Sequence, residues 1–339
     1  MLAEYIRKVV AGQSLTEVEA AKAMEAIMEG QATPAQIGAF LTALRLKGET
    51  VDEITGFART MRRLAVPLKV RRQVLVDTCG TGGDGSHTFN ISTAAAFVVA
   101  GAGVPVAKHG NRSVSSRAGS ADVLEALGVR VDLPPAGVEE CLEKVGMGFL
   151  FAPSFHKAMK HAAGPRREIG IRTVFNLLGP LTNPAGAPYQ LVGVYGPELT
   201  ETVASVLGRL GCRRAFVVHG SDGLDEITIT GPTKITRLEE GSLETFFFDP
   251  AEIGIGPVGP EELLGGTAAD NAEIIRGVLK GRPGPARDVV VVNAAFALMA
   301  AGVASSVREG MALAAQSIDT GAAHGKLAAL IRFTESWAA

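Results

Sequence analysis

The first part of the chain, residues 1–70, carries apolar positions at helical spacing and no alternating pattern typical of a strand. One such helical face consists of Ile37, Phe40, Leu41 and Leu44. Helix starts are predicted where Ser or Thr precedes Glu or Gln by three positions, in the segments Ser14 to Glu17, Thr33 to Gln36 and Thr50 to Glu53. The first of these helices is expected to reach Gly30, and the third to end before Pro67.

From Val74 onward the pattern changes, because short β-rich runs alternate with helical segments. Strands are predicted at residues 74–76, 104–107 and 215–218, and helices at 92–100, 121–127 (capped by Ser120) and 289–300, with further helices to Trp337. The predicted fold class is α/β: a small all-helical N-terminal domain, residues 1–70, and a large α/β domain, residues 71–339, with a central, largely parallel sheet flanked by helices. A returning segment near residues 168–188 is expected to complete the helical domain.

Composition narrows the class of protein. Of 339 residues, 47% are hydrophobic and 20% charged, which excludes a disordered chain. The formal net charge is -2 and no basic run is present, so neither nucleic acid nor a membrane surface is an expected partner. The sequence shows no signal-peptide pattern and no apolar stretch of membrane-spanning length, and its three cysteines fit no disulfide or zinc spacing. A cytoplasmic protein is expected.

Polar clusters follow three of the predicted strands. Ligands of open α/β sheets bind beyond the carboxyl ends of the strands, so these clusters are expected to lie close together. The first cluster, residues 77–93, contains Gly80-Thr81-Gly82-Gly83-Asp84. Its glycines can turn backbone amides around an anion, and Asn90, Ser92 and Thr93 stand at a helix start, where free amides attract phosphate. The cluster predicts a phosphate site, with an ordinary glycine-rich turn as the alternative.

The glycine cluster also matches the dinucleotide pattern G-x-G-x-x-G through Gly80, Gly82 and Gly85. A nicotinamide site is nevertheless disfavoured, because no helix starts inside the motif and the next strand ends in Lys108 and His109 rather than an acid. The G-x-S-x-G pattern of serine hydrolases and the G-K-[ST] pattern of phosphate-binding loops are both absent.

The second cluster, residues 108–120, combines cations with short hydroxyl side chains. Lys108 and Arg112 supply positive charge, and the guanidinium of Arg112 can bind phosphate through two hydrogen bonds. The hydroxyls belong to Ser113, Ser115, Ser116 and Ser120. We interpret the cluster as a second phosphate-binding loop, against the alternative of a polar surface loop.

The third cluster, Asp222 to Glu226, places acids in a loop after the strand at 215–218. Mg²⁺ needs only one or two protein carboxylates where it also binds substrate phosphates. Taken alone, the segment fits a solvated turn better than a metal site. Beside two phosphate-binding loops it predicts a Mg²⁺ site.

Together these segments resemble the anthranilate phosphoribosyltransferase family. The motifs that carry the resemblance are GTGGD at 80–84, NIST at 90–93, KHGNRSVSS at 108–116, NLLGPLTNP at 176–184 and DGLDE at 222–226. The resemblance implies phosphoribosyl pyrophosphate (PRPP) and anthranilate as substrates, Mg²⁺ as cofactor, and a homodimer joined through the helical domains. The implied products are N-(5-phosphoribosyl)anthranilate, an intermediate of tryptophan biosynthesis, and pyrophosphate.

The resemblance also implies roles for individual residues. PRPP would be bound by Gly80, Gly83, Asp84, Thr88, Asn90, Ile91, Ser92, Thr93, Lys108, His109, Gly110, Asn111, Arg112, Ser113, Val114, Ser115, Ser116 and Ser120. Mg²⁺ would be bound by Ser92, Asp225 and Glu226, and anthranilate by Gly80, His109, Asn111, Arg166, Gly179 and Pro180. No dedicated catalytic side chain is expected, and Lys108 and Arg112 would act electrostatically on the leaving pyrophosphate.

One local departure from the family concerns the anthranilate arginine. Family members commonly carry Pro-x-Arg there, whereas this chain carries Gly164-Pro165-Arg166. The neighbouring Arg167 is therefore a rival for the role.

Two other functions remain as alternatives. A pyrimidine nucleoside phosphorylase has a similar fold but usually carries an additional C-terminal domain, for which the length leaves no room. A non-catalytic homologue that binds nucleic acid should have gained positive charge, which the net charge of -2 does not support.

Overall fold

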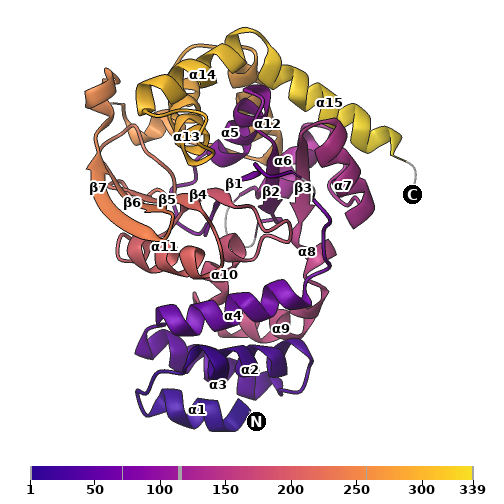
Figure 1. Cartoon of the computed structure of the whole chain (residues 1–339), viewed down its shortest axis with the longest axis vertical. Helices are drawn as coiled ribbons and strands as arrows, with labels where there is room; N and C mark the ends of the chain where they lie inside the picture. Colours follow the sequence, from indigo (N-terminus) through magenta and orange to yellow (C-terminus); the bar gives the residue numbers. More distant parts are fainter. Residues whose placement is uncertain (1, 71, 114–116, 257, 338–339) are drawn as a thin grey trace.

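The computed structural model describes residues 2–70, 72–113, 117–256 and 258–337. The N-terminal helices form a bundle at one end of the molecule, and the larger part beyond it is built around a sheet (Figure 1). This arrangement confirms the predicted fold class. The predicted PRPP contacts Val114, Ser115 and Ser116 lie outside the described residues.

The bundle contains α1 (Leu2–Val10), α2 (Glu17–Met28), α3 (Pro34–Lys47) and α4 (Val51–Leu64). Thr33 and Thr50 cap α3 and α4 with the predicted capping boxes. For α2 the predicted pair Ser14 and Glu17 is wrong, because the box is formed by Thr16 and Glu19. The two pairs have the same spacing, but the Glu19 carboxylate is also held by Lys8 at 2.7 Å.

Seven strands form one sheet in the order β3-β2-β1-β4-β5-β6-β7. The first five in this order are parallel, whereas β6 is antiparallel to β5 and β7 is antiparallel to β6. The strands are β1 (Val76–Gly80), β2 (Val106–Gly110), β3 (Met147–Phe151), β4 (Tyr189–Gly193), β5 (Arg214–Gly220), β6 (Thr233–Glu239) and β7 (Ser242–Phe248). From β1 the chain first adds β2 and β3 on one side, and then returns to add β4 on the other side of β1. The strand order therefore reverses at β1.

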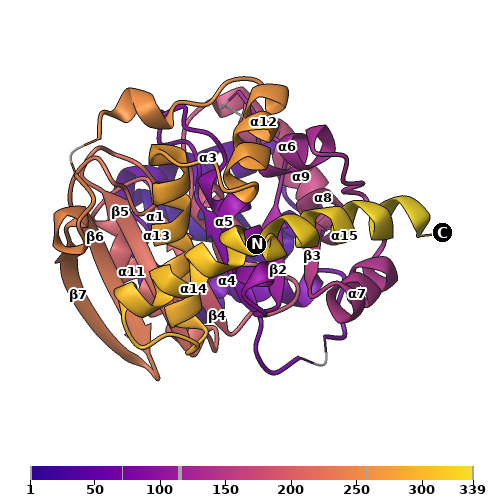
Figure 2. The same cartoon turned by 90° about the horizontal axis from the view of Figure 1, so that it is seen from above.

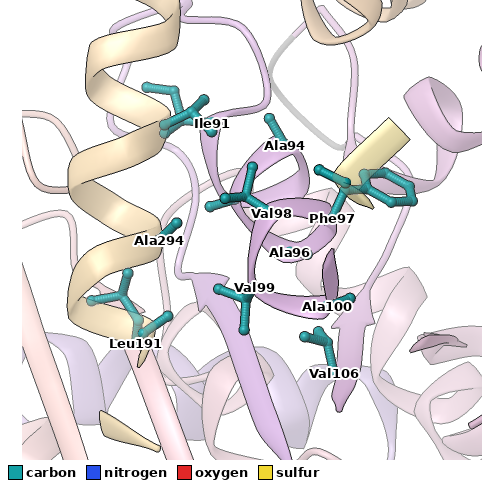
Figure 3. Close-up of a cluster of buried hydrophobic side chains, with 14 of the residues drawn as sticks. Ile91, Ala94, Ala96, Phe97, Val98, Val99, Ala100, Val106, Leu191 and Ala294 are labelled. Carbon is teal, nitrogen blue, oxygen red and sulfur yellow. The ribbon is translucent and has the colours of Figure 1, made fainter. Parts of the chain in front are cut away.

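Helices cover both faces of the sheet (Figures 1 and 2). Side chains alternate along a strand, so Leu191 of β4 joins the core on one face and Val192 the core on the other. Figure 3 shows the first core, where Leu191 and Val106 meet Val98 and Val99 of α5 (Ile91–Gly101) and Ala294 of α13 (Pro285–Ala300). The remaining helices of the larger part are α6 (Ser120–Ala126), α7 (Pro135–Lys144), α8 (Ala152–Phe155), α11 (Leu199–Arg209), α12 (Ala268–Leu279), α14 (Val307–Asp319) and α15 (Ala322–Ser336).

The strands predicted at 74–76 and 104–107 begin and end later than expected. The strands continue through polar residues because these residues are buried with partners: Asp77 accepts a hydrogen bond from the amide of His109, and Lys108 donates to the carbonyl of Thr78. The predicted strand at 215–218 and helix at 289–300 are confirmed, and the helix expected at 121–127 begins one residue earlier, after Gly119. Strands β3, β4, β6 and β7 were not predicted.

Two later helices return to the bundle. α9 (Lys160–Ile169) packs against α2 and α3, and α10 (Phe175–Leu181) packs against α4. Ala162, Phe175 and Leu178 accordingly share one core with Phe40 and Phe57 of the bundle. Among the described residues, no helix is both long and apolar enough to cross a membrane.

Candidate functional site

The predicted polar clusters do meet at one edge of the sheet. β1, β2, β4 and β5 run parallel, so their carboxyl ends lie at the same edge. The glycine-rich loop follows β1, residues 111–113 and 117–119 follow β2, and Asp225 and Glu226 lie in the segment after β5. The glycine-rich loop therefore sits where the strand order reverses, the usual ligand position in such sheets.

Asp225 is packed directly against the ends of β1 and β4. A Cβ atom at Gly80 would collide with the Asp225 carboxylate, and one at Gly193 would collide with the Asp225 backbone. The amide of Gly82 donates to Asp225 Oδ2 at 2.7 Å. Glycine is required at both strand ends because only a hydrogen there leaves room for the acidic segment. This contact joins the first and third clusters.

Three acids are close enough to affect one another. Burial, Asp84 and Glu226 raise the pKa of Asp225 well above its ordinary value. Burial raises the pKa of Glu226 to about 7, although Lys108 opposes the shift. Such buried, mutually repelling carboxylates are stabilised by a cation between them. Their hard oxygen donors fit Mg²⁺.

Lys108 and Ser92 connect the second cluster to these acids. The Lys108 ammonium donates to the carbonyl of Thr78 and, at 3.3 Å, to Ser92 Oγ. The Ser92 amide, at the first turn of α5, donates to Glu226 Oε1 at 3.1 Å. Ile91 and Thr93 flank Ser92 and are buried. The structure thus brings Ser92, Lys108, Asp225 and Glu226 together.

The loop after β2 is held by acids of α6. Arg112 pairs with Glu125 at 2.5 Å and with Asp122 at 3.2 Å, and the amide of Ser113 donates to Asp122 at 3.0 Å. Ser120 Oγ donates to the carbonyl of Asn111 at 3.3 Å. Gly110 permits this packing, because a Cβ there would collide with Ser120 and Phe149.

Asn90 and Thr88 lie on the side of the glycine-rich loop nearest α12. The Asn90 side chain donates to the carbonyl of Ala118 at 3.3 Å and accepts from Asn271 at 2.9 Å. Thr88 forms an isolated antiparallel bridge with Leu264. Asn90 therefore bridges the first and second clusters.

A second group of predicted residues lies where α9 and α10 meet the sheet edge. His109 Nδ1 is 3.1 Å from the carbonyl of Gly179, and the rings of His109 and His156 lie 5.2 Å apart. Burial lowers the pKa of His109 to about 3, with His156 as a smaller cause, and burial lowers the pKa of His156 to about 4. Both rings are therefore neutral near pH 7. Pro180 is buried beside Gly179.

Arg166 approaches the same region from α9. Its guanidinium lies 4.9 Å from the centre of the Phe175 ring, and burial lowers its pKa. In the described part of the chain, no carboxylate pairs with it. Pro165 is accommodated inside α9, so the shifted proline does not end the helix. The rival Arg167 is exposed.

Sequence reasoning missed two polar anchors of the site. Asn183 donates to the buried Asp77 carboxylate at 2.7 Å and to the carbonyl of Ala107 at 2.9 Å, which fixes the segment after α10 to the sheet. Arg172 donates to the carbonyl of Gly83. Asn183 lies in the motif at 176–184, so the sequence could have indicated it as a site residue. No pattern in the sequence marks Arg172.

Comparisons with known proteins find similar families and relatives along nearly the whole chain. The description "Glycosyl transferase family, helical bundle domain" matches residues 3–65, and "Glycosyl transferase family, a/b domain" matches residues 72–324. The anthranilate phosphoribosyltransferase of Moorella thermoacetica is 70% identical over 339 residues, which cover 100% of both chains.

Solved structures show the same similarity. The crystal structure of anthranilate phosphoribosyltransferase from Thermus thermophilus has a TM-score of 0.93 at 46% identity and covers 98% of this chain and 99% of its own. The Saccharomyces cerevisiae enzyme in complex with PRPP and Mg has a TM-score of 0.91 at 29% identity, with 99% and 98% covered. The yeast enzyme has also been solved in complex with 4-fluoroanthranilate. The chain therefore belongs to the anthranilate phosphoribosyltransferase family, glycosyltransferases of tryptophan biosynthesis.

Proposed function

We propose that this chain transfers the phosphoribosyl group of PRPP to the amine of anthranilate at the described sheet edge. The observation that carries the proposal is the contact of the Gly82 amide with Asp225, which joins an anion-binding loop to an acidic pair. Lys108 lies close enough to Glu226 to oppose the rise in its pKa, so positive charge, loop amides and carboxylates lie near one another. A magnesium-bound diphosphate needs all three.

The PRPP-binding side consists of the glycine-rich loop, the start of α5 and the loop after β2. We propose that Gly80, Gly83, Asp84, Thr88 and residues 90–93 bind PRPP together with residues 108–116 and Ser120. Gly82 and Gly83 have φ angles of 65° and 71°, a left-handed conformation that glycine adopts without strain and that this turn of the loop requires. When PRPP binds, Arg112 would release Glu125 and pair instead with phosphate oxygens. Like a carboxylate, these oxygens are negatively charged and can accept two hydrogen bonds from the guanidinium.

The proposed Mg²⁺ ligands are Ser92, Asp225 and Glu226. The raised pKa values of the two acids arise from burial and mutual repulsion, which a divalent cation would relieve. Bound there, Mg²⁺ would supply positive charge to the departing pyrophosphate. The 3.1 Å hydrogen bond from the Ser92 amide orients Glu226 for this role.

The acceptor side would bind anthranilate through Arg166, whose guanidinium matches a carboxylate. His109, Asn111, Gly80 and Gly179-Pro180 would line the rest of the pocket. Neutral His109 leaves Arg166 as the cation for the substrate carboxylate, since burial lowers the pKa of the imidazole to about 3. The aromatic amine is neutral near pH 7, so its attack on the ribose carbon needs positioning rather than a side-chain nucleophile.

The functional unit would be a cytoplasmic homodimer joined through the helical domains, with no nucleic-acid partner. Val10, Val18 and Leu46 of the bundle are 69%, 64% and 84% exposed, and a partner would cover such apolar side chains. We retain residues 1–70 as the helical domain, completed by the segment near 168–188, and residues 71–339 as the α/β domain. Light scattering should give twice the mass of 35.2 kDa.

The test of the transferase is the loss of anthranilate fluorescence on addition of PRPP and Mg²⁺. We expect turnover with both present and none after Mg²⁺ is removed by chelation. Phosphorolysis of thymidine, with no consumption of anthranilate, would instead identify a nucleoside phosphorylase.

A further inference from the structure

The glycine-rich loop is held at three successive residues by three different parts of the chain. The amide of Thr81 donates to the carbonyl of Gly193 at 3.0 Å, at the end of β4. The amide of Gly82 donates to Asp225 at 2.7 Å. The carbonyl of Gly83 accepts a hydrogen bond from Arg172. Only the third contact comes from the segment that connects α9 to α10.

The contact at Gly83 determines which way the next amide points. In a trans peptide the C=O and N–H of one unit point in opposite directions. Holding the Gly83 carbonyl toward Arg172 therefore turns the Asp84 amide away from Arg172. In the described part of the chain, no hydrogen-bond acceptor is found for the amides of Gly83 and Asp84. These two amides are thus available to an anion.

Arg172 is itself held in place by Tyr195. Its guanidinium lies 4.7 Å from the centre of the Tyr195 ring, a distance that suits a cation–π contact. The Tyr195 amide in turn donates to Thr81 Oγ1 at 3.1 Å, so Tyr195 touches both the loop and the arginine that fixes the loop. Arg172 and Tyr195 act on the loop as one unit.

The same pair connects the loop to the helical bundle. Arg172 follows the C-cap of α9, Gly170, and α9 packs against α3. Burial raises the pKa of Tyr195, and Arg45 and Glu49, at the end of α3 and just beyond it, shift that pKa in opposite directions. Tyr195 also packs against the core that the bundle shares with α10.

We propose that Arg172, held by Tyr195, is a positioning residue that orients the Gly83–Asp84 peptide for the pyrophosphate of the donor. This inference rests on the proposed function, because it assumes that the loop binds the pyrophosphate of PRPP. Arg172 acts through the loop backbone and does not touch the reacting atoms.

The test compares four single variants and one double variant in PRPP binding and turnover. Arg172→Ala should raise the donor KM about tenfold, the effect of losing one charge-assisted hydrogen bond, and leave the anthranilate KM within about twofold. Arg172→Lys should restore the donor KM only in part, because lysine lacks the planar fork and stacks less well. Tyr195→Leu should raise the donor KM less than Arg172→Ala does, and Tyr195→Phe should not change it.

Arg172→Lys separates positioning from direct attraction of the anion, because lysine keeps the charge and direct attraction would predict full rescue. The double variant tests whether Tyr195 acts through Arg172: Arg172→Ala with Tyr195→Leu should then be no worse than Arg172→Ala alone. Additive effects, full rescue by Arg172→Lys or a selective rise in the anthranilate KM would each contradict the proposal. Arg237→Ala, which removes an exposed arginine paired with Glu244 on β6 and β7, is the matched charge control.

The two proposals can fail separately. Absence of wild-type transfer to anthranilate would reject the proposed function. Calorimetric titration with PRPP and Mg²⁺ still tests Arg172 in that case, since binding needs no turnover. Equal PRPP affinity of wild type and Arg172→Ala would reject the role of Arg172.

Discussion

The two sides of the site are built differently. On the PRPP side, hydrogen bonds connect Lys108 to Ser92 and Ser92 to Glu226, and Asp225 beside them accepts from the amide of Gly82. On the anthranilate side, Arg166 has no acidic partner among the described residues, and His109 and His156 are neutral and buried. Several charged groups therefore meet on the first side, whereas the second side combines a single cation with neutral, buried rings.

The largest expected effect follows from removing the charge of the PRPP side. Asp225→Asn with Glu226→Gln should lower Mg²⁺-dependent turnover by about 1000-fold or more, because the leaving group loses its electrostatic stabilisation. At pH 8 the unfolding temperature should not fall, since two buried charges that repel each other are gone. Steady-state kinetics and thermal unfolding measure the two results. Near-normal rates at limiting Mg²⁺ would show that the acids bind no metal.

The next largest effect should be confined to the anthranilate side. Arg166→Ala should raise the anthranilate KM by about 100-fold, as expected for loss of an ion pair to a carboxylate, and the donor KM by less than about twofold. Arg167→Ala is the matched variant on the same helix and should change neither constant strongly. Equal increases of the two KM values in Arg166→Ala would show that Arg166 does not belong to a separate anthranilate side.

Acid should weaken the anthranilate side through its histidines. Because their folded-state pKa values of about 3 and about 4 lie below the ordinary value, the neutral forms stabilise the fold above pH 6.5. Stability is lost as the pH falls from 6.5 toward 4, by on the order of 2 kcal/mol per histidine at pH 5. The raised pKa values of Asp77, Asp225 and Glu226 act in the opposite direction.

A comparison of variants isolates the histidine contribution. His156→Phe should lose less stability between pH 7 and pH 5 than wild type, as measured by urea unfolding at each pH. Parallel pH profiles would show that His156 is protonated in the folded state as readily as in the unfolded state.

The smallest expected effect concerns Thr16, which lies outside both sides of the site. This prediction therefore tests stability alone. Thr16→Ala should lower the free energy of unfolding by about 1 kcal/mol through loss of the α2 cap. Ser14→Ala is its control and should change stability little. Thermal unfolding distinguishes the two variants, and both should keep wild-type KM values. A larger loss of stability in Ser14→Ala than in Thr16→Ala would mean that Ser14 caps α2, as the sequence predicts.

The PRPP side was largely predictable because strand-end clusters are local in sequence. Glycines, hydroxyls and acids in three short segments, together with the rule that parallel strands end at one edge, bring Ser92, Lys108 and Asp225 together. The exact strand limits were not predictable, since buried Asp77 and Lys108 look like loop residues until their partners are known.

The anthranilate side depends on packing between distant segments. The 3.1 Å contact of His109 with Gly179, the pairing of Asp77 with Asn183 and the contact of Arg172 with Gly83 each join residues that no periodic pattern relates. Family resemblance supplied His109, Arg166 and Gly179, but it could not supply the tertiary contacts that hold them. The antiparallel strands β6 and β7 could not be predicted from the sequence, because neither Thr233–Glu239 nor Ser242–Phe248 alternates apolar and polar residues.

The central claim, that the clusters after β1, β2 and β5 form one metal-dependent PRPP site, is tested most directly by a crystal structure with Mn²⁺ in place of Mg²⁺ and PRPP. We expect an anomalous peak at about 2.2 Å from carboxylate oxygens of Asp225 or Glu226, with the pyrophosphate against the amides of Gly83 and Asp84. A metal peak away from both acids, or a pyrophosphate bound away from the glycine-rich loop, would contradict it.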